Sequence, residues 1–313
     1  MSSLNQKIDH AFDETTMLIL GVQVLIGFQF QSVFQTVFDR LPAWTQYLKL
    51  GGLGLLLFAL AWLIAPAAYQ CITERGHDTH DLNQFTIRAA AIALLPFSFG
   101  VAIEFFIAGL RVQGESLAWV AGLAALGVTL FAWYGLELIT RTGRRGAARK
   151  GERAMAKAEN EQAGGTPLSE KIDNVLAEAR MVLPGAQALL GFQLAMMFVE
   201  DFDKLEERIK YIHMGGLAAI GVSMVLLMTP AAYHRIVESG EDSESFHRLA
   251  SRLVLSAMAF LALGVAMDFL VVVDKVSGSL VWGAIGGAAV LVLFYGLWFG
   301  YSLYRRQQLG KAG

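Results

Sequence analysis

Four glutamines stand inside long apolar stretches of this sequence: Gln23 and Gln29 in the first half, Gln187 and Gln193 in the second. A polar side chain within such a stretch is costly unless it finds a partner or serves a function. Gln23 and Gln29 lie on different faces of a helix, which favours the interior of a bundle. The four amides could line a narrow polar path, or they could hydrogen-bond and join the two halves.

Charged residues of opposite sign recur at matching places in the two halves. Glu14 and Arg88 fall at the same ends of the first and third apolar stretches, and Glu178 and Arg252 repeat the arrangement. A pair of this kind would offset part of the desolvation of each charge. The interpretations are a structural clamp between the two stretches, or a gate that opens when the acid is protonated.

A carboxylate also recurs within the third apolar stretch of each half, as Glu104 and Asp268. We expect both to lie toward the outer side. Acids at this depth are typical of a vestibule that attracts cations, or of proton coupling. They could equally reach the outer interface, and Glu104 could pair locally with Arg111.

Motifs for catalysis or cofactor binding are lacking. Cys71 is the single cysteine, so no internal disulfide and no cysteine metal cluster is expected. The run His77 to Asp81 could hold a metal loosely, but it also suits a solvated loop. His234 and His247 lie near the ends of apolar stretches, where they do not suit haem ligation. We expect no enzyme, no cofactor, no metal site and no nucleic-acid partner.

The chain is a tandem repeat. Shifted by 164 positions it matches itself, and fifteen of the thirty-six residues from 4 to 39 are identical. The match includes Gly21-x-Gln23, Gly27-Phe28-Gln29 and Pro66-Ala67-Ala68-Tyr69, which fall on Gly185-x-Gln187, Gly191-Phe192-Gln193 and Pro230-Ala231-Ala232-Tyr233. The polar residues above are therefore repeated features of a duplicated unit.

Each half contains four apolar stretches long enough for a membrane helix. The chain has 55% hydrophobic and 17% charged residues. Soluble domains have more charge, with ~25% of their residues charged. A helix satisfies its own backbone, as a bilayer requires. We predict an all-α integral membrane protein with eight transmembrane helices, at about 15–37, 46–70, 86–110, 117–140, 179–199, 211–234, 249–272 and 279–303.

Basic residues predict the topology. Residues 141–160 carry seven of them, so the positive-inside rule places this segment in the cytoplasm, together with both termini. Four spans per half make the repeats parallel, related by a pseudo-two-fold axis along the membrane normal. The linker could bind anionic lipid, at ~1 kcal/mol per basic residue, or be a flexible tether. The predicted units are 1–141, 142–167, 168–306 and a tail at 307–313.

The repeated motifs resemble an uncharacterised family of bacterial membrane proteins of unknown function. The resemblance rests on the Glu to Gly-x-Gln to Gly-Phe-Gln pattern and on Pro-Ala-Ala-Tyr, and it covers most of the chain as two fused four-span copies. The second copy departs from it at Leu194, which replaces Phe30. The resemblance implies the helical fold and a bacterial inner-membrane location, and it carries no activity.

Repeated polar residues in apolar helices favour a channel or transporter-like protein for a small ion or solute. Its pathway would run near the pseudo-two-fold axis, between the repeats. The alternative is a membrane scaffold, or a protein that binds lipids or a partner. Two chains of this pseudo-symmetric form could also pair as a homodimer.

Overall fold

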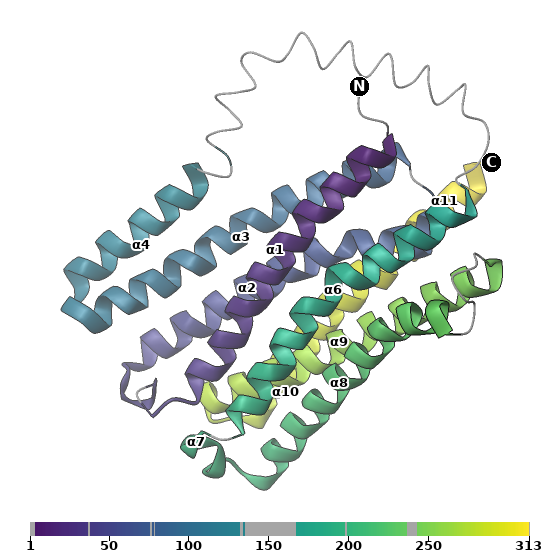
Figure 1. The fold of residues 1–313 in the computed structure, drawn as a ribbon. Helices are drawn as coiled ribbons and strands as arrows, with labels where there is room; N and C mark the ends of the chain where they lie inside the picture. Colours follow the sequence, from purple (N-terminus) through teal and green to yellow (C-terminus); the bar gives the residue numbers. More distant parts are fainter. Residues whose placement is uncertain are drawn as a thin grey trace.

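A computed structural model describes residues 4–36, 38–75, 77, 79–131, 134, 167–197, 199–236 and 243–312. All elements formed by these residues are helices (Figure 1). The first repeat contains α1 (Leu4–Val33), η1 (Phe38–Arg40), α2 (Ala43–Tyr69), η2 (Gln70–Glu74), α3 (His80–Gln113) and α4 (Glu115–Leu130). The second contains α6 (Leu168–Met196), α7 (Glu200–Asp203), α8 (Glu207–Ile236), α9 (Glu244–Ser277), α10 (Leu280–Tyr295), η4 (Gly296–Tyr301) and α11 (Ser302–Ala312).

Seven helices of the described segments are long and apolar enough to cross a membrane, which makes this an α-helical membrane protein. Five of them lie in α1, α3, α6, α8 and α9. The other two start in α2 and α10 and continue into the helical segments that follow. The one remaining predicted span, 117–140, begins in α4 and continues into residues that lie largely outside the described part. The predicted linker, 142–167, also lies outside it except for its last residue.

The chain reverses at two ends of the bundle. α1 begins and α11 ends at one end, and α7 lies at the other, which we call the turn end (Figure 1). The turns from α3 to α4 and from α9 to α10 contain Gly114 and Gly278, whose φ angles are 85° and 65°. Glycine adopts these angles without the steric cost that a side chain brings. The third and fourth helices of each repeat can therefore follow each other after a very short turn.

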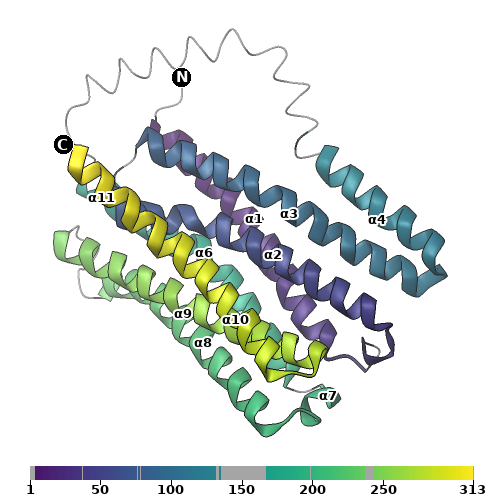
Figure 2. The same cartoon turned by 180° about the vertical axis from the view of Figure 1, so that it is seen from behind.

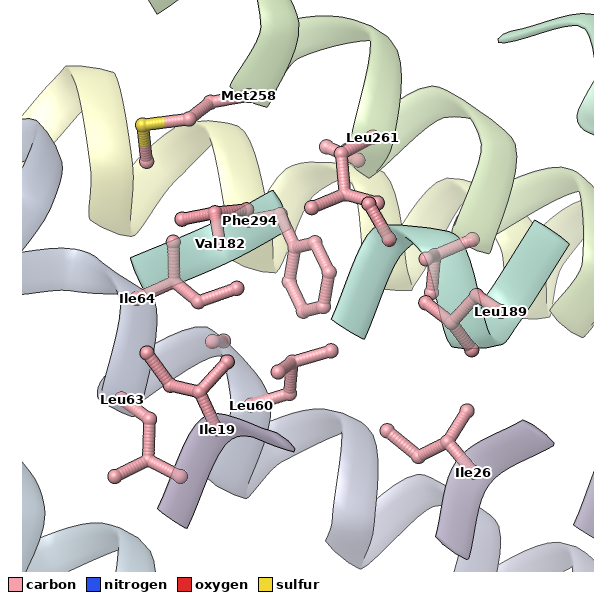
Figure 3. Close-up of a cluster of buried hydrophobic side chains, with 14 of the residues drawn as sticks. Ile19, Ile26, Leu60, Leu63, Ile64, Val182, Leu189, Met258, Leu261 and Phe294 are labelled. Atoms are coloured by element: carbon pink, nitrogen blue, oxygen red, sulfur yellow. The ribbon is translucent and has the colours of Figure 1, made fainter. Parts of the chain in front are cut away.

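The two repeats share one apolar core. Ile19 and Ile26 of α1 face the same cluster as Val182 and Leu189 of α6, and Phe294 of α10 joins them (Figure 3). All five side chains are almost fully buried. Burial of apolar surface shared by both repeats joins the halves into a single bundle.

Glycines let α1 and α6 approach closely. A methyl group at Gly27 would overlap the Phe192 ring, and one at Gly185 would overlap the side-chain amide of Gln23. The rings of Phe28 and Phe192 are 4.5 Å apart across the same contact. This α1–α6 seam therefore depends on small residues, as close helix contacts in membranes commonly do.

Gly27→Ala should lower the free energy of unfolding by about 1–3 kcal/mol, because the Phe192 ring must move to admit the methyl group. Gly191→Ala is the matched control, since Gly191 occupies the equivalent place in the second repeat and has no atom within 4 Å of the added methyl group. Both variants gain the same helix propensity. Denaturant unfolding of the full chain in mixed micelles measures the difference, and equal losses would contradict the seam.

The fourth helices of the two repeats have different neighbours. In the second repeat, α10 and η4 pack against both α9 and α2. Trp298 is buried there, and its Nε1 donates a hydrogen bond to the Ala61 carbonyl over 2.8 Å. In the first repeat, α4 packs against α3 and stands at the edge of the bundle opposite α8 (Figure 2). In the fourth helices the offset between the repeats falls to 161, so the equivalent of Trp298 is Glu137, which lies outside the described residues.

Candidate functional site

Three buried polar side chains from three helices meet in the second repeat, and we call them the second-repeat cluster: Gln193 of α6, His213 of α8 and Asp268 of α9. Gln193 Nε2 donates a hydrogen bond to Asp268 Oδ2. Nδ1 of His213 lies 3.5 Å from Asp268 Oδ1. The other ring nitrogen, Nε2, lies 3.2 Å from the backbone carbonyl of Gln193.

The first repeat has an equivalent set, the first-repeat cluster: Gln29 of α1, Lys49 of α2 and Glu104 of α3. Each lies 164 positions before its counterpart. Lys49 Nζ lies 2.8 Å and 3.0 Å from the two oxygens of Glu104. The Lys49 side chain is 8% exposed and that of Glu104 is 29% exposed. Gln29 is buried, and among the described residues neither of its amide atoms has a hydrogen-bond partner.

The helices place both clusters at the same depth. Lys49 and His213 each lie six residues after the first residue of their helices, and Glu104 and Asp268 each lie nine residues before the last. At a rise of about 1.5 Å per residue, the carboxylates stand roughly 13 Å inside the turn end. These charges are therefore set within the helical bundle.

Glycines bring the second and third helices together beside each cluster. A methyl group at Gly100 would lie 2.7 Å from Cδ2 of Leu56, and one at Gly264 would lie 2.9 Å from the Gly216 carbonyl. One at Gly216 would lie 3.2 Å from Oδ1 of Asp268. Small residues here let the backbones approach until a basic side chain on one helix reaches an acid on the next.

A short helix closes the turn end beside the second-repeat cluster. The Phe202 ring of α7 packs edge-on to His213, with ring centroids 5.3 Å apart. Its neighbour Asp201 is buried and pairs with Lys204 Nζ over 2.5 Å. This hydrogen bond raises the pKa of Lys204. In the first repeat, η1 supplies the equivalent aromatic residue, Phe38, which is also buried.

Each cluster combines one carboxylate with one basic side chain, so it can be neutral overall. In an apolar bundle a carboxylate is stable only while a cation or a proton accompanies it. The clusters can therefore hold a proton or exchange one positive partner for another. The basic side chain is a lysine in the first cluster and a histidine in the second.

The two predicted outer acids, Glu104 and Asp268, are both cluster members. Of the two interpretations of the glutamines, a hydrogen bond between the halves is not formed by Gln29 and Gln193 in the described structure, because Gln193 donates to Asp268 of its own repeat. A carboxylate is a stronger acceptor than a second amide. The halves are therefore joined at the α1–α6 seam by close packing, without an amide pair.

The other predicted glutamines differ between the repeats. Gln23 is fully buried at the α1–α6 seam, and within the described part of the chain neither of its amide atoms has a partner. Its counterpart Gln187 is exposed. The first glutamine of the repeated motif therefore lies inside the bundle in the first repeat and on its outside in the second.

The predicted ion pair between Glu178 and Arg252 is not formed among the described residues. Glu178 is buried and accepts a hydrogen bond from Cys71 Sγ over 2.5 Å, whereas Arg252 is exposed. Arg88 is also exposed and donates to Gln84 Oε1 over 3.2 Å. The side chain of Glu14 lies outside the described residues, so its pairing with Arg88 stays a prediction.

Sequence reasoning missed Lys49 and His213, the basic partners in the clusters. They are not identical, so a comparison that counts identities passes over them. The signal that could have found them is the 164-residue shift, which places a basic residue at the same position of both repeats.

The sequence profile of a family of unknown function, DUF6328, matches the chain twice, at residues 3–137 and 167–302. The chain belongs to the DUF6328 family. Its two DUF6328 units form a tandem duplication, and each unit contains one carboxylate beside one basic side chain. No curated protein and no solved structure matches the chain.

Proposed function

We propose that this DUF6328 protein moves a small ion or solute across a bacterial inner membrane, as a channel or transporter. Eight crossing helices, related by a pseudo-two-fold axis, would place both termini in the cytoplasm and the turn end outside. The observation that carries the proposal is the pairing of a carboxylate with a basic residue inside each unit, at the same depth. Ionisable residues placed so within membrane helices commonly mark ion pathways or proton relays.

The first-repeat cluster offers an entry from the turn end. Glu104 keeps 29% of its side-chain surface exposed, so a proton or cation can reach its carboxylate. Either one would weaken the contact with Lys49, because both compete for the same negative charge. Gln29 and Gln23 of α1 are buried, and their amide atoms have no hydrogen-bond partner among the described residues. They would carry the pathway between the repeats.

A flux assay tests the proposal. The purified full chain in liposomes should conduct protons or alkali cations under an imposed potential, followed with an internal pH dye and with cation-selective electrodes. Glu104→Gln and Asp268→Asn should each lower this flux by about tenfold or more, because they keep the shape but remove the charge. Asp203→Asn, at an exposed carboxylate in α7, is the matched control and should keep the flux. Flux no greater than in protein-free liposomes would contradict the proposal.

The alternative function is a membrane scaffold, or a protein that binds lipids or a partner. One observation favours lipid binding: an apolar groove of about 200 Å³ between α3 and α4, lined among others by Phe99, Phe106, Trp119 and Leu123. Its lining would suit an acyl chain. Retention of a defined lipid by the purified chain, together with absent flux, would favour this alternative.

A further inference from the structure

We propose that the second-repeat cluster is a proton-binding site that loosens when it loses its proton, whereas the first-repeat cluster is held closed by a permanent cation. The inference rests on the proposed function only in treating the clusters as its working groups. Beyond that function, we expect the two clusters to respond differently to pH, with a proton as the ligand of the second-repeat cluster.

The geometry of His213 carries the inference. Both ring nitrogens face oxygen atoms, since Nε2 lies 3.2 Å from the Gln193 carbonyl and Nδ1 lies 3.5 Å from Asp268 Oδ1. A neutral imidazole has a single N–H, whereas an imidazolium donates at both nitrogens. The protonated ring therefore donates to the Gln193 carbonyl and places its positive charge 3.5 Å from Asp268 Oδ1. The imidazolium charge then balances the carboxylate charge of Asp268, so the cluster is neutral overall.

Among the described residues, Asp268 has no second cation beside it. The group that faces His213 from α9 is Asp268, from α6 it is the Gln193 carbonyl, and from α7 it is the Phe202 ring. The nearby acid of α7, Asp201, is already paired with Lys204. When the proton leaves, Asp268 remains as a buried carboxylate whose only remaining donor among the described side chains is Gln193.

The sign of the effect follows from this charge count. At low pH the proton is present, and α6, α8 and α9 are tied together through the cluster. At high pH a bare carboxylate remains in the bundle, so the contact opens to admit water or a cation. The first-repeat cluster keeps its tie, because a lysine ammonium holds its proton to much higher pH than an imidazolium does.

Hydrogen exchange of the full chain in lipid nanodiscs tests the inference. Labelling at about pH 6 and about pH 9, with times scaled for the intrinsic rate, should show roughly tenfold faster exchange at high pH around His213 and Asp268. Segments around Lys49 and Glu104 should not change. His213→Lys should remove the response, and Lys49→His should create one in the first repeat. His77→Lys, in the loop before α3, is the matched control and should leave the wild-type response intact.

An identical pH response in the wild type and in His213→Lys would overturn the inference, as would the lack of any response around Asp268. If His213→Lys does not fold, two other variants decide. Lys49→His must gain a response, and Asp268→Asn, which removes the acid that needs the proton, must lose it. A pH response without flux would refute transport and keep the proton site. Flux that Glu104→Gln lowers, without a pH response around Asp268, would keep transport and refute the proton site.

Discussion

Replacing His213 by leucine should lower the free energy of unfolding by about 3–5 kcal/mol, the usual cost of removing one partner from a buried pair. The side chains of His213 and Asp268 are 0% and 2% exposed, so water does not reach the pair in this closed conformation. Asp268 would be left buried without a cation, so it would have to take up a proton or remain charged at high cost, and the Gln193 carbonyl would lose its donor. Reversible unfolding of the full chain in mixed micelles near pH 6 measures the loss.

The double variant His213→Leu/Asp268→Leu is the control for this prediction. Replacement of a whole buried pair by apolar residues is often neutral or stabilising, so the double variant should recover most of the lost stability. Equal losses in the single and double variants would mean that packing around His213, and not its charge pair with Asp268, stabilises this part of the bundle.

Trp298→Ala should also lower the free energy of unfolding by about 3–5 kcal/mol, as deletion of a buried tryptophan side chain does. Trp298 of η4 is completely buried against α2. Its ring stacks on Phe294, with ring centroids 4.7 Å apart. The variant would also remove the hydrogen bond from Nε1 to the Ala61 carbonyl, which joins the second repeat to the first. The loss therefore falls on the contact between the repeats.

Trp282→Ala is the matched control, because Trp282 lies on the adjoining helix α10 and is 61% exposed. A substitution at an exposed position usually changes stability by less than about 0.5 kcal/mol. The same unfolding assay applies to both variants. A loss in Trp282→Ala as large as in Trp298→Ala would show that the contact between η4 and α2 contributes little.

The fold could be predicted to a large extent because a bilayer restricts the choice of structure. The apolar stretch predicted at 249–272 lies within α9, and the one at 211–234 lies within α8. Hydrocarbon thickness sets the length of such helices, and backbone hydrogen bonding excludes open strands. The short helices η1 and α7 were not predicted, since they lie between the apolar stretches.

The carboxylates of the site could be predicted, but their partners could not. Glu104 and Asp268 were found because an acid in both repeats is visible within a long apolar stretch. Lys49 and His213 lie near the starts of the stretches predicted at 46–70 and 211–234, where a polar residue is expected to face the interface. Only the approach of the helices at their glycines shows that these side chains turn inward to an acid.

Features that depend on how the two repeats pack together could not be predicted from the sequence. The same motif contains Gln23 and Gln187, yet one is buried at the seam and the other is exposed. Glu178 bonds to Cys71 of the other repeat, and not to the arginine that the repeat pattern favours. A duplicated sequence predicts the contacts within each unit better than those between units.

A high-resolution structure of the full chain in lipid nanodiscs tests the central claim most directly, through the density for water and ions beside the two clusters. The account predicts a hydrated path from the turn end to Glu104 and Asp268 that continues toward Gln23 at the α1–α6 seam. Dry clusters, closed by direct side-chain contacts in every conformation observed, would contradict transport and favour a scaffold.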